Sequence, residues 1–327
     1  MRADVTQTLD TKKTGLPLLR LRTIKPEAVE SAVSGKESRN LYRDSAGMKG
    51  LRQMGTPNVK ILVASHKKYK MPTDEIYLPL HVGAEGKLDE EGCPLDLGWT
   101  KDNTGDNISE LNSGYCELTG LYWGWKNLKA DYIGLVHYRR HFCRKKKSQD
   151  PFKNILTGEE LRPLLGQYWV FVPKKRRYYI ETLYSHYAHT HYAEHLDLTR
   201  EVIAERCPEY LASFDRIMRR RYGYMFNMMI MRRDLADKYC TWLFDILFAL
   251  SKKMGDTELS FYQGRYFGRV SELILNVWLD RQISVSYIPR ERICELSTIY
   301  TEKILWYKKA ASFLKAKYLG TKYEGSF

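Results

Sequence analysis

Cationic side chains follow three apolar segments of the sequence, each where a strand would end. These cations are His66, Lys67 and Lys68; Arg139 and Arg140; and Lys174, Lys175, Arg176 and Arg177. Arginine forks bind phosphate oxygens in pairs, and lysine supplies a compact positive charge. If the three strands are neighbours, the cations converge on one rim that suits a diphosphate. For any single cluster, solvated loop charge is the alternative.

A second polar group lies at the start of an expected helix. Asp106 and Asn107 precede the apolar-periodic residues, and free backbone N–H groups at a helix start favour anionic or hydroxyl ligands. Asn107 with Glu110 also has the form of a capping box, which needs no ligand. Further along the same helix, Asn112 belongs to a polar and aromatic stripe that either binds sugar hydroxyls or is ordinary surface.

Group transfer from a diphosphate also needs a base or a carboxylate near the reacting carbon. The candidates are Asp106, Glu117, Glu272 and His137. Glu272 follows Gly268 at the expected start of a helix, so it could equally be a carboxylate that complements the helix dipole.

The elements that must position these residues alternate along the chain. Strands are expected at 59–64, 76–82, 131–136, 168–172 and 226–231, and helices from 107 to about 125 and over 181–193, 197–206, 208–220, 234–252 and 268–280. Such alternation favours an α/β fold with a largely parallel sheet, in which ligands bind beyond the carboxyl ends of the strands.

The two ends of the chain differ from the middle. Residues 1–56 are rich in Lys, Arg, Ser, Thr and Gly and are expected to be a disordered or loosely attached tail, before a folded domain over 57–298. In 299–327, Trp306, Phe313 and Leu314 share one face of a predicted basic amphipathic helix. That helix is expected either to lie on an anionic membrane surface or to dock on the domain.

Composition restricts the partners. The formal net charge of +14 indicates an anionic partner: nucleic acid, acidic lipid or a phosphorylated substrate. The six cysteines include no CxxC pair, which favours reduced thiols in the cytosol. No apolar run approaches the roughly 20 residues that span a bilayer, and the first residues lack the apolar region of a secretory signal, so a cytoplasmic protein is expected.

Several motifs together resemble a known family. They include KILVASHK (60–67), TGDNIS (104–109), ELT (117–119), YWGWK (122–126), DYIGLVHYRR (131–140), VPKK (172–175), Phe226-Asn227 and Ser271-Glu272. The chain from about 59 to 290 is similar to the bacterial family named domain of unknown function 4422, whose members are called capsular or exopolysaccharide biosynthesis glycosyltransferases. No role of an individual residue comes with this resemblance, so Tyr138 and Asn227 enter the candidate donor site only as motif positions.

The resemblance implies a GT-A-like, Rossmann-type α/β fold with a mixed, mainly parallel sheet flanked by helices. It also implies a nucleotide-sugar donor, with UDP-galactose or its furanose form as examples, and a lipid-linked oligosaccharide acceptor at the inner face of the membrane. The sequence contains no Asp-x-Asp pair of the kind that holds a metal on the donor in many sugar transferases. Two solutions stay open: Mn²⁺ or Mg²⁺ held by other residues, or cationic side chains that neutralise the leaving diphosphate.

The sequence therefore predicts a glycosyltransferase with Asp106, Glu272 and His137 as candidate catalytic residues. The candidate donor-binding residues are His66, Lys67, Asp106, Asn107, Asn112, Tyr138, Arg139, Arg140, Lys174 and Asn227. Two alternatives are a non-catalytic sugar-binding protein of the same fold and a basic nucleic-acid-binding protein. The sequence carries none of the usual nucleic-acid-binding signatures, so nucleic acid is not the expected partner.

Overall fold

The structure is a computed structural model that describes residues 18–20, 56–145, 148–255 and 258–302. Most of the tail predicted over 1–56 and the helix predicted near the C-terminus lie outside these residues. Within the tail, β1 (Leu18–Arg20) pairs antiparallel with β11 (Glu258–Ser260). No helix in the described part of the chain is long and apolar enough to cross a bilayer.

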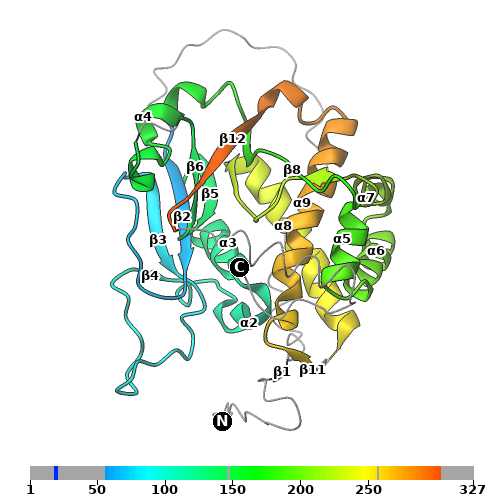
Figure 1. Ribbon diagram of the computed structural model, residues 1–327, viewed down its shortest axis with the longest axis horizontal. Helices are drawn as coiled ribbons and strands as arrows, with labels where there is room; N and C mark the ends of the chain where they lie inside the picture. Colours follow the sequence, from blue (N-terminus) through cyan, green and yellow to red (C-terminus); the bar gives the residue numbers. More distant parts are fainter. Residues whose placement is uncertain (1–17, 21–55, 146–147, 256–257, 303–327) are drawn as a thin grey trace.

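A mixed eight-stranded sheet forms the centre of the fold (Figure 1). In spatial order its strands are β10 (Met229–Arg232), β7 (Val170–Pro173), β12 (Ile293–Tyr300), β6 (Arg140–Cys143), β5 (Tyr132–His137), β2 (Val59–Ser65), β3 (Tyr77–His81) and β4 (Thr100–Lys101). β10 also pairs with β5, so the strands from β5 round to β10 close on themselves.

The sheet is only partly parallel. β5, β2, β3 and β4 run parallel to one another, as the sequence predicts, but β5 is antiparallel to its other neighbour β6. β10 is antiparallel to both β5 and β7, and β6 is antiparallel to β12. β10 is antiparallel to β5 because of where it begins. The chain turns at Phe226 and Asn227 beside the carboxyl end of β5, and β10 therefore runs in the opposite direction along β5.

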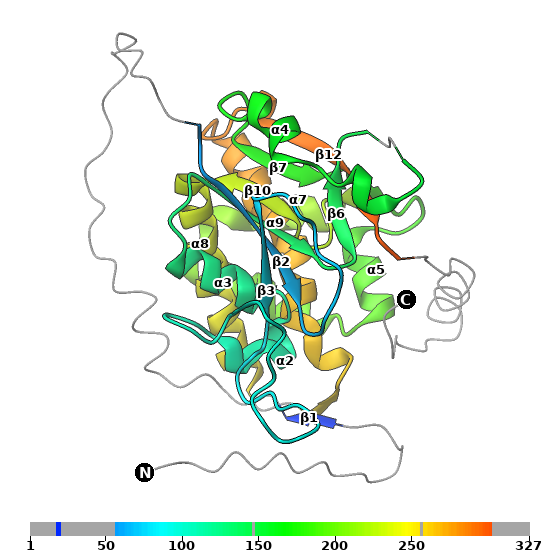
Figure 2. The same ribbon diagram turned by 90° about the vertical axis from the view of Figure 1, so that its left-hand side faces the viewer.

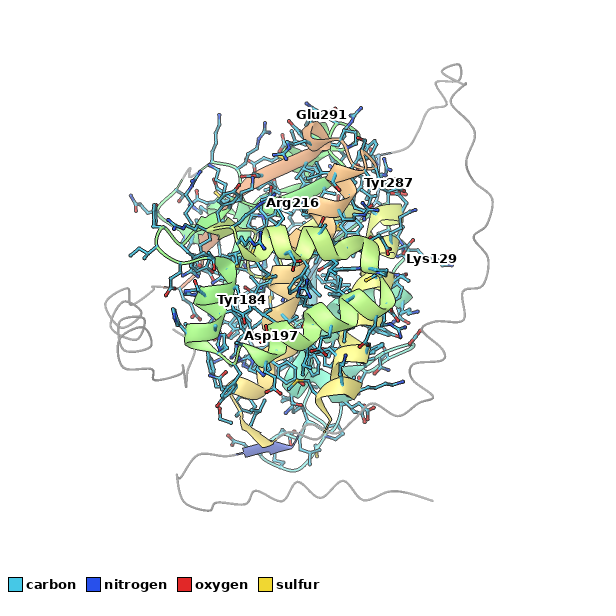
Figure 3. All side chains as sticks on the ribbon, turned by 90° about the vertical axis from the view of Figure 1, so that its right-hand side faces the viewer. Lys129, Tyr184, Asp197, Arg216, Tyr287 and Glu291 are labelled. Atoms are coloured by element: carbon cyan, nitrogen blue, oxygen red, sulfur yellow. The ribbon has the colours of Figure 1, made fainter. Side chains whose placement is uncertain are left out.

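Helices lie in two layers on one face of the sheet. The inner layer contains α3 (Leu118–Asn127), α8 (Arg233–Met254) and α9 (Tyr266–Ser284). The outer layer contains α5 (Leu183–Thr190), α6 (Glu194–Arg206) and α7 (Leu211–Met218), with α6 against α8 and α7 against α9. Figure 3 looks onto this outer layer, where the labelled Tyr184, Asp197 and Arg216 belong to α5, α6 and α7 in turn.

Successive side chains of a strand face opposite sides of the sheet, and this alternation gives two hydrophobic cores. Leu62 and Ala64 of β2 pack with the helices of the inner layer, while Ile61 and Val63 belong to the cluster on the opposite face. That second face is covered by short elements such as α4 (Gly158–Leu161), which lies at the top of the sheet in Figure 2. β2 is therefore buried on both faces, which explains its continuous apolar sequence.

The helix predicted from Asn107 onward is wrong in its first half. A 3₁₀ turn, η1 (Ser109–Leu111), is followed by α2 (Asn112–Tyr115), and the chain then breaks at Cys116, whose φ is 54°. The Asn112 side chain donates to the Cys116 carbonyl at 2.7 Å, which satisfies a group that the break releases. Because α3 starts afresh at Leu118, Glu117 stands at its beginning.

Candidate functional site

The carboxyl ends of three strands meet at one edge of the sheet. β2 and β5 are parallel neighbours, and β7 runs in the direction of β5 because both are antiparallel to β10. Since β2 ends at Ser65, β5 at His137 and β7 at Pro173, the three cationic clusters that follow them share this edge. The sequence predicts that these strand ends share one edge, whereas a single rim that includes the third cluster stays a prediction.

The first two clusters are in direct contact. The ring of His66 lies 5.7 Å from that of Tyr138, and the Arg139 guanidinium lies 5.1 Å from the same ring. Burial lowers the pKa of His66, and the positive charges of Lys67, Arg265 and Arg139 lower it further. The rim therefore carries a positive potential that suits a phosphate group. Arg139 also faces Glu302 at 3.6 Å.

Arg265 belongs to this rim, although no sequence motif predicts it. It ends η5 (Gln263–Arg265), just before α9, and its Nε lies 3.0 Å from the Sγ of Cys116. The nearby Cys116 thiol raises the pKa of Arg265, so the guanidinium stays charged. No strand-end pattern marks this arginine, because only the break at Cys116 brings α2 beside η5.

His137, at the end of β5, is fixed by the backbone. Its Nε2 lies 2.6 Å from the carbonyl oxygen of Phe226, so this nitrogen carries the proton and donates. The Oε1 of Glu117 lies 4.0 Å from the same nitrogen. Burial lowers the pKa of His137, and the Glu117 carboxylate only partly opposes that effect. The imidazole is therefore neutral near pH 7.

Asn227 holds Glu117 in place through a hydrogen bond. Its Nδ2 donates to Glu117 Oε1 at 2.6 Å and to the Gly268 carbonyl at 2.8 Å, and its Oδ1 accepts from Ser271 at 2.8 Å. The side chain is fully buried. Asn227 is thus placed to hold the Glu117 carboxylate in position from the protein interior.

Glu272 lies in the second turn of α9, so the helix-dipole interpretation does not apply to it. Burial raises its pKa to about 7, and the negative charge of Glu117 adds to the rise, while a backbone hydrogen bond from Phe226 and the charges of Arg140 and Arg176 oppose it. A carboxyl group with this pKa exchanges protons near neutral pH, as a general base requires.

Arg140 faces the same cluster from β6. Its guanidinium lies 3.5 Å from the centre of the Phe226 ring and 4.5 Å from that of Tyr300. Burial lowers its pKa, and its buried Nε has no hydrogen-bond partner among the described residues. Arg140 therefore supplies a cation with unused donor capacity beside Glu272.

Other predicted residues lie elsewhere. Asp106 is exposed and accepts a hydrogen bond from Tyr122 at 3.1 Å, while its backbone N–H bonds Asn127 at the far end of α3. The ten residues of α3, about 15 Å of helix, therefore separate it from Glu117. The structure does not bring Asp106 together with His137 and Glu272.

Asn107, Asn112 and Lys174 are also not gathered with this cluster. Asn107 does not cap a helix and instead accepts from the Ser109 N–H at 3.1 Å in a local turn. Asn112 is committed to Cys116 and Thr119. Lys174 follows β7 at the same sheet edge and is exposed.

Asp102 anchors the segment that contains the Gly-Asp-Asn-Ile-Ser motif, a role that the sequence alone does not predict. This fully buried carboxylate accepts from the Gly83 N–H at 2.9 Å, the Ala84 N–H at 3.1 Å, Ser109 Oγ at 2.5 Å and Thr119 Oγ1 at 2.6 Å. Four donors on one carboxylate join the end of β3 to η1 and α3. Asp102 is a structural anchor.

Within the described part of the chain, no group of three or more His, Cys, Asp or Glu side chains is arranged to hold a metal ion. The cluster at the sheet edge is instead a pair of carboxylates, Glu117 and Glu272, with Arg140, Arg265 and the neutral imidazole of His137 around them.

Comparisons with known proteins agree with this architecture. A solved structure described as the apo form of WbbM, a bifunctional glycosyltransferase, is similar with a TM-score of 0.66 and 29% sequence identity. The match covers 75% of this chain but only 46% of that one, so this chain corresponds to less than half of WbbM. Among the curated proteins there is no match. The model of the family described as Domain of unknown function (DUF4422) matches residues 60–283, and the chain therefore belongs to the DUF4422 family.

Proposed function

We propose that this chain is a glycosyltransferase that moves a hexose from a nucleotide-diphosphate sugar to a lipid-linked surface polysaccharide acceptor. The observation that carries the proposal is the partly buried carboxyl group of Glu272, whose pKa is raised to about 7 at a sheet edge rich in cations. The likeness to a glycosyltransferase supports the same reaction class.

The donor diphosphate binds at the rim formed by His66, Arg139 and Arg265. Their charges act on one another, as the lowered pKa of His66 indicates. Lys67 and Tyr138 complete this rim at the ends of β2 and β5. Arginine forks there neutralise the charge that develops on the departing diphosphate.

Glu272 takes the proton from the acceptor hydroxyl while the hydroxyl oxygen forms a bond to the anomeric carbon of the donor. The bond from that carbon to the donor phosphate oxygen breaks, and the electron pair leaves with the diphosphate. Glu117 keeps the pKa of Glu272 high, and Arg140 moderates that effect. Neutral His137 acts through its Phe226 contact as a positioning group.

A donor screen tests the proposal. The full chain is incubated with UDP-galactose, UDP-galactofuranose and other nucleotide sugars, each with Mn²⁺, with Mg²⁺ or with a chelator, and both release of the nucleotide and the melting temperature are measured. A bound donor raises the melting temperature by mass action. We expect binding and slow turnover of at least one donor. A chain that binds no nucleotide sugar under any of these conditions is not this enzyme, and one that binds UDP but never cleaves the donor is a sugar-binding protein.

A further inference from the structure

Two segments next to the sheet edge form an exposed feature that the reaction does not use. β8 (Arg176–Arg177) pairs antiparallel with β9 (Tyr222–Gly223), and the turn after β8 carries Tyr179 and Ile180. These two side chains are 77% and 69% exposed. This feature, the basic tip, consists of Arg177, Tyr179, Ile180, Arg219, Arg221 and Tyr222.

The exposed side chains of the basic tip stand on an ordered backbone. The Tyr178 N–H donates to the Arg221 carbonyl at 2.8 Å, and Arg221 Nη1 donates to the Tyr179 carbonyl at 3.1 Å. Tyr179 has a φ of 55°, a left-handed conformation that is rare for a bulky residue. Packing within the described part of the chain does not account for an exposed aromatic residue in a strained conformation, which points to a partner.

Charge identifies the kind of partner. Arg177, Arg219 and Arg221 are exposed, and in the described ranges no acidic side chain forms a salt bridge with them. The nearby carboxylates are already engaged: Asp280 binds Arg216 and Arg220, Asp215 binds Arg200, and Glu295 binds Lys175. The basic tip therefore presents positive charge that no acidic side chain of the described residues pairs with in a salt bridge.

We propose that the basic tip docks on a membrane surface that contains anionic lipid. Arginines bind the headgroup phosphates, while Tyr179 and Ile180 enter the interface between headgroups and acyl chains. Small apolar tips flanked by cations suit this layer, whereas a standard-size protein–protein interface buries about 800 Å² on each partner. The residues of the basic tip lie outside the segment 299–327, for which the sequence predicts a basic amphipathic helix.

Docking through the basic tip also orients the candidate site. Arg176 belongs to β8, and its charge acts on Glu272. The carboxyl edge of the sheet would thus lie beside the lipid surface, where a lipid-linked acceptor is presented. That last step rests on the proposed function, but membrane binding itself does not.

Vesicle cosedimentation of the full chain tests the proposal. Vesicles of phosphatidylcholine alone are compared with vesicles that also contain phosphatidylglycerol. We expect binding only to the second kind. The double variant Tyr179→Ser with Ile180→Ser should weaken it at least about tenfold, and the double variant Arg177→Gln with Arg221→Gln should weaken it by about fivefold per arginine. Leu88→Ser is the matched control, since Leu88 is a 60% exposed apolar residue in another loop.

Each other outcome overturns the proposal. Equal binding to both kinds of vesicle removes the role of charge, and unchanged binding by the Tyr179 and Ile180 variant places the docking surface elsewhere. If the chain binds random DNA through the same arginines and does not bind vesicles, the basic tip is a nucleic-acid site. Melting temperatures establish that the variants are folded. Turnover of a water-soluble acceptor should not change in the Tyr179 and Ile180 variant, so failure of this proposal is distinguishable from failure of glycosyl transfer.

Discussion

Substitution of Glu272 by Gln separates a catalytic from a structural role for this residue. The amide keeps the shape of the side chain but cannot take a proton from the acceptor. Removal of a general base typically lowers the rate by about 10²- to 10⁴-fold, so we expect a loss of kcat of at least about 10²-fold in Glu272→Gln. In the unsubstituted chain, kcat/KM should rise with pH and level off above about 7, where Glu272 is ionised.

The same substitution should stabilise the fold. The pKa of Glu272 rises from 4.5 to about 7 on folding. Below the lower value the group is protonated in both states. As pH rises between the two values, the unfolded chain loses this proton first, and the free energy of unfolding falls. Above the higher value the whole penalty remains, about 3 kcal/mol. Gln carries no charge and avoids that penalty.

Thermal unfolding at two pH values measures this effect. Near pH 8, Glu272→Gln should melt roughly 5 °C higher than the unsubstituted chain, and the difference should vanish well below pH 4.5, the ordinary pKa of the group. Glu209→Gln, at an exposed carboxylate on the outer layer, should change neither rate nor melting temperature. A Glu272→Gln protein that keeps full activity, or that melts lower at pH 8, would refute the reasoning.

Three further substitutions test the groups around Glu272. Arg139→Ala should weaken UDP binding about tenfold, through the loss of a charge-assisted hydrogen bond; titration calorimetry measures it, and unchanged affinity in a folded protein contradicts the role. Asn227→Ala should destabilise the fold by about 2 kcal/mol and lower kcat more than UDP affinity, because Glu117 loses a hydrogen bond. An equal loss of kcat and of UDP affinity would mean that Asn227 contacts the nucleotide sugar directly. Asp102→Asn should cost about 3 kcal/mol or more in denaturant unfolding, since four donors lose a carboxylate, and a change below about 1 kcal/mol would exclude an anchor role.

The strands and their shared edge could be predicted because they depend on local pattern. The run from Val59 to Ala64 is apolar without interruption, as a strand buried on both faces requires, and β2 occupies it. Once the strands are parallel, their carboxyl ends must meet, so the cations after β2 and β5 come together. His66 and Arg139 accordingly contact the same tyrosine ring.

The inner part of the candidate site could not be predicted because it depends on contacts between distant segments. The helical spacing from Ile108 to Trp125 hides a break, and that break aims Cys116 and Glu117 toward residues 265–272. A fully apolar run such as that around Met229 gives no sign of strand direction. Arg265 follows no strand and matches no spacing rule, so only the folded chain identifies it.

One strained residue connects the groups that the proposed reaction needs. Phe226 has a φ of 79°, which costs of order 1–3 kcal/mol for a non-glycine residue. Its carbonyl accepts from His137, its backbone bonds Glu272, and its ring covers Arg140. A relaxed φ would turn the carbonyl and the N–H away from their partners. The buried hydrogen bonds of Asn227 keep the turn in this conformation. The strain thus lowers stability and in return aligns an imidazole, a carboxyl group and a guanidinium around one residue.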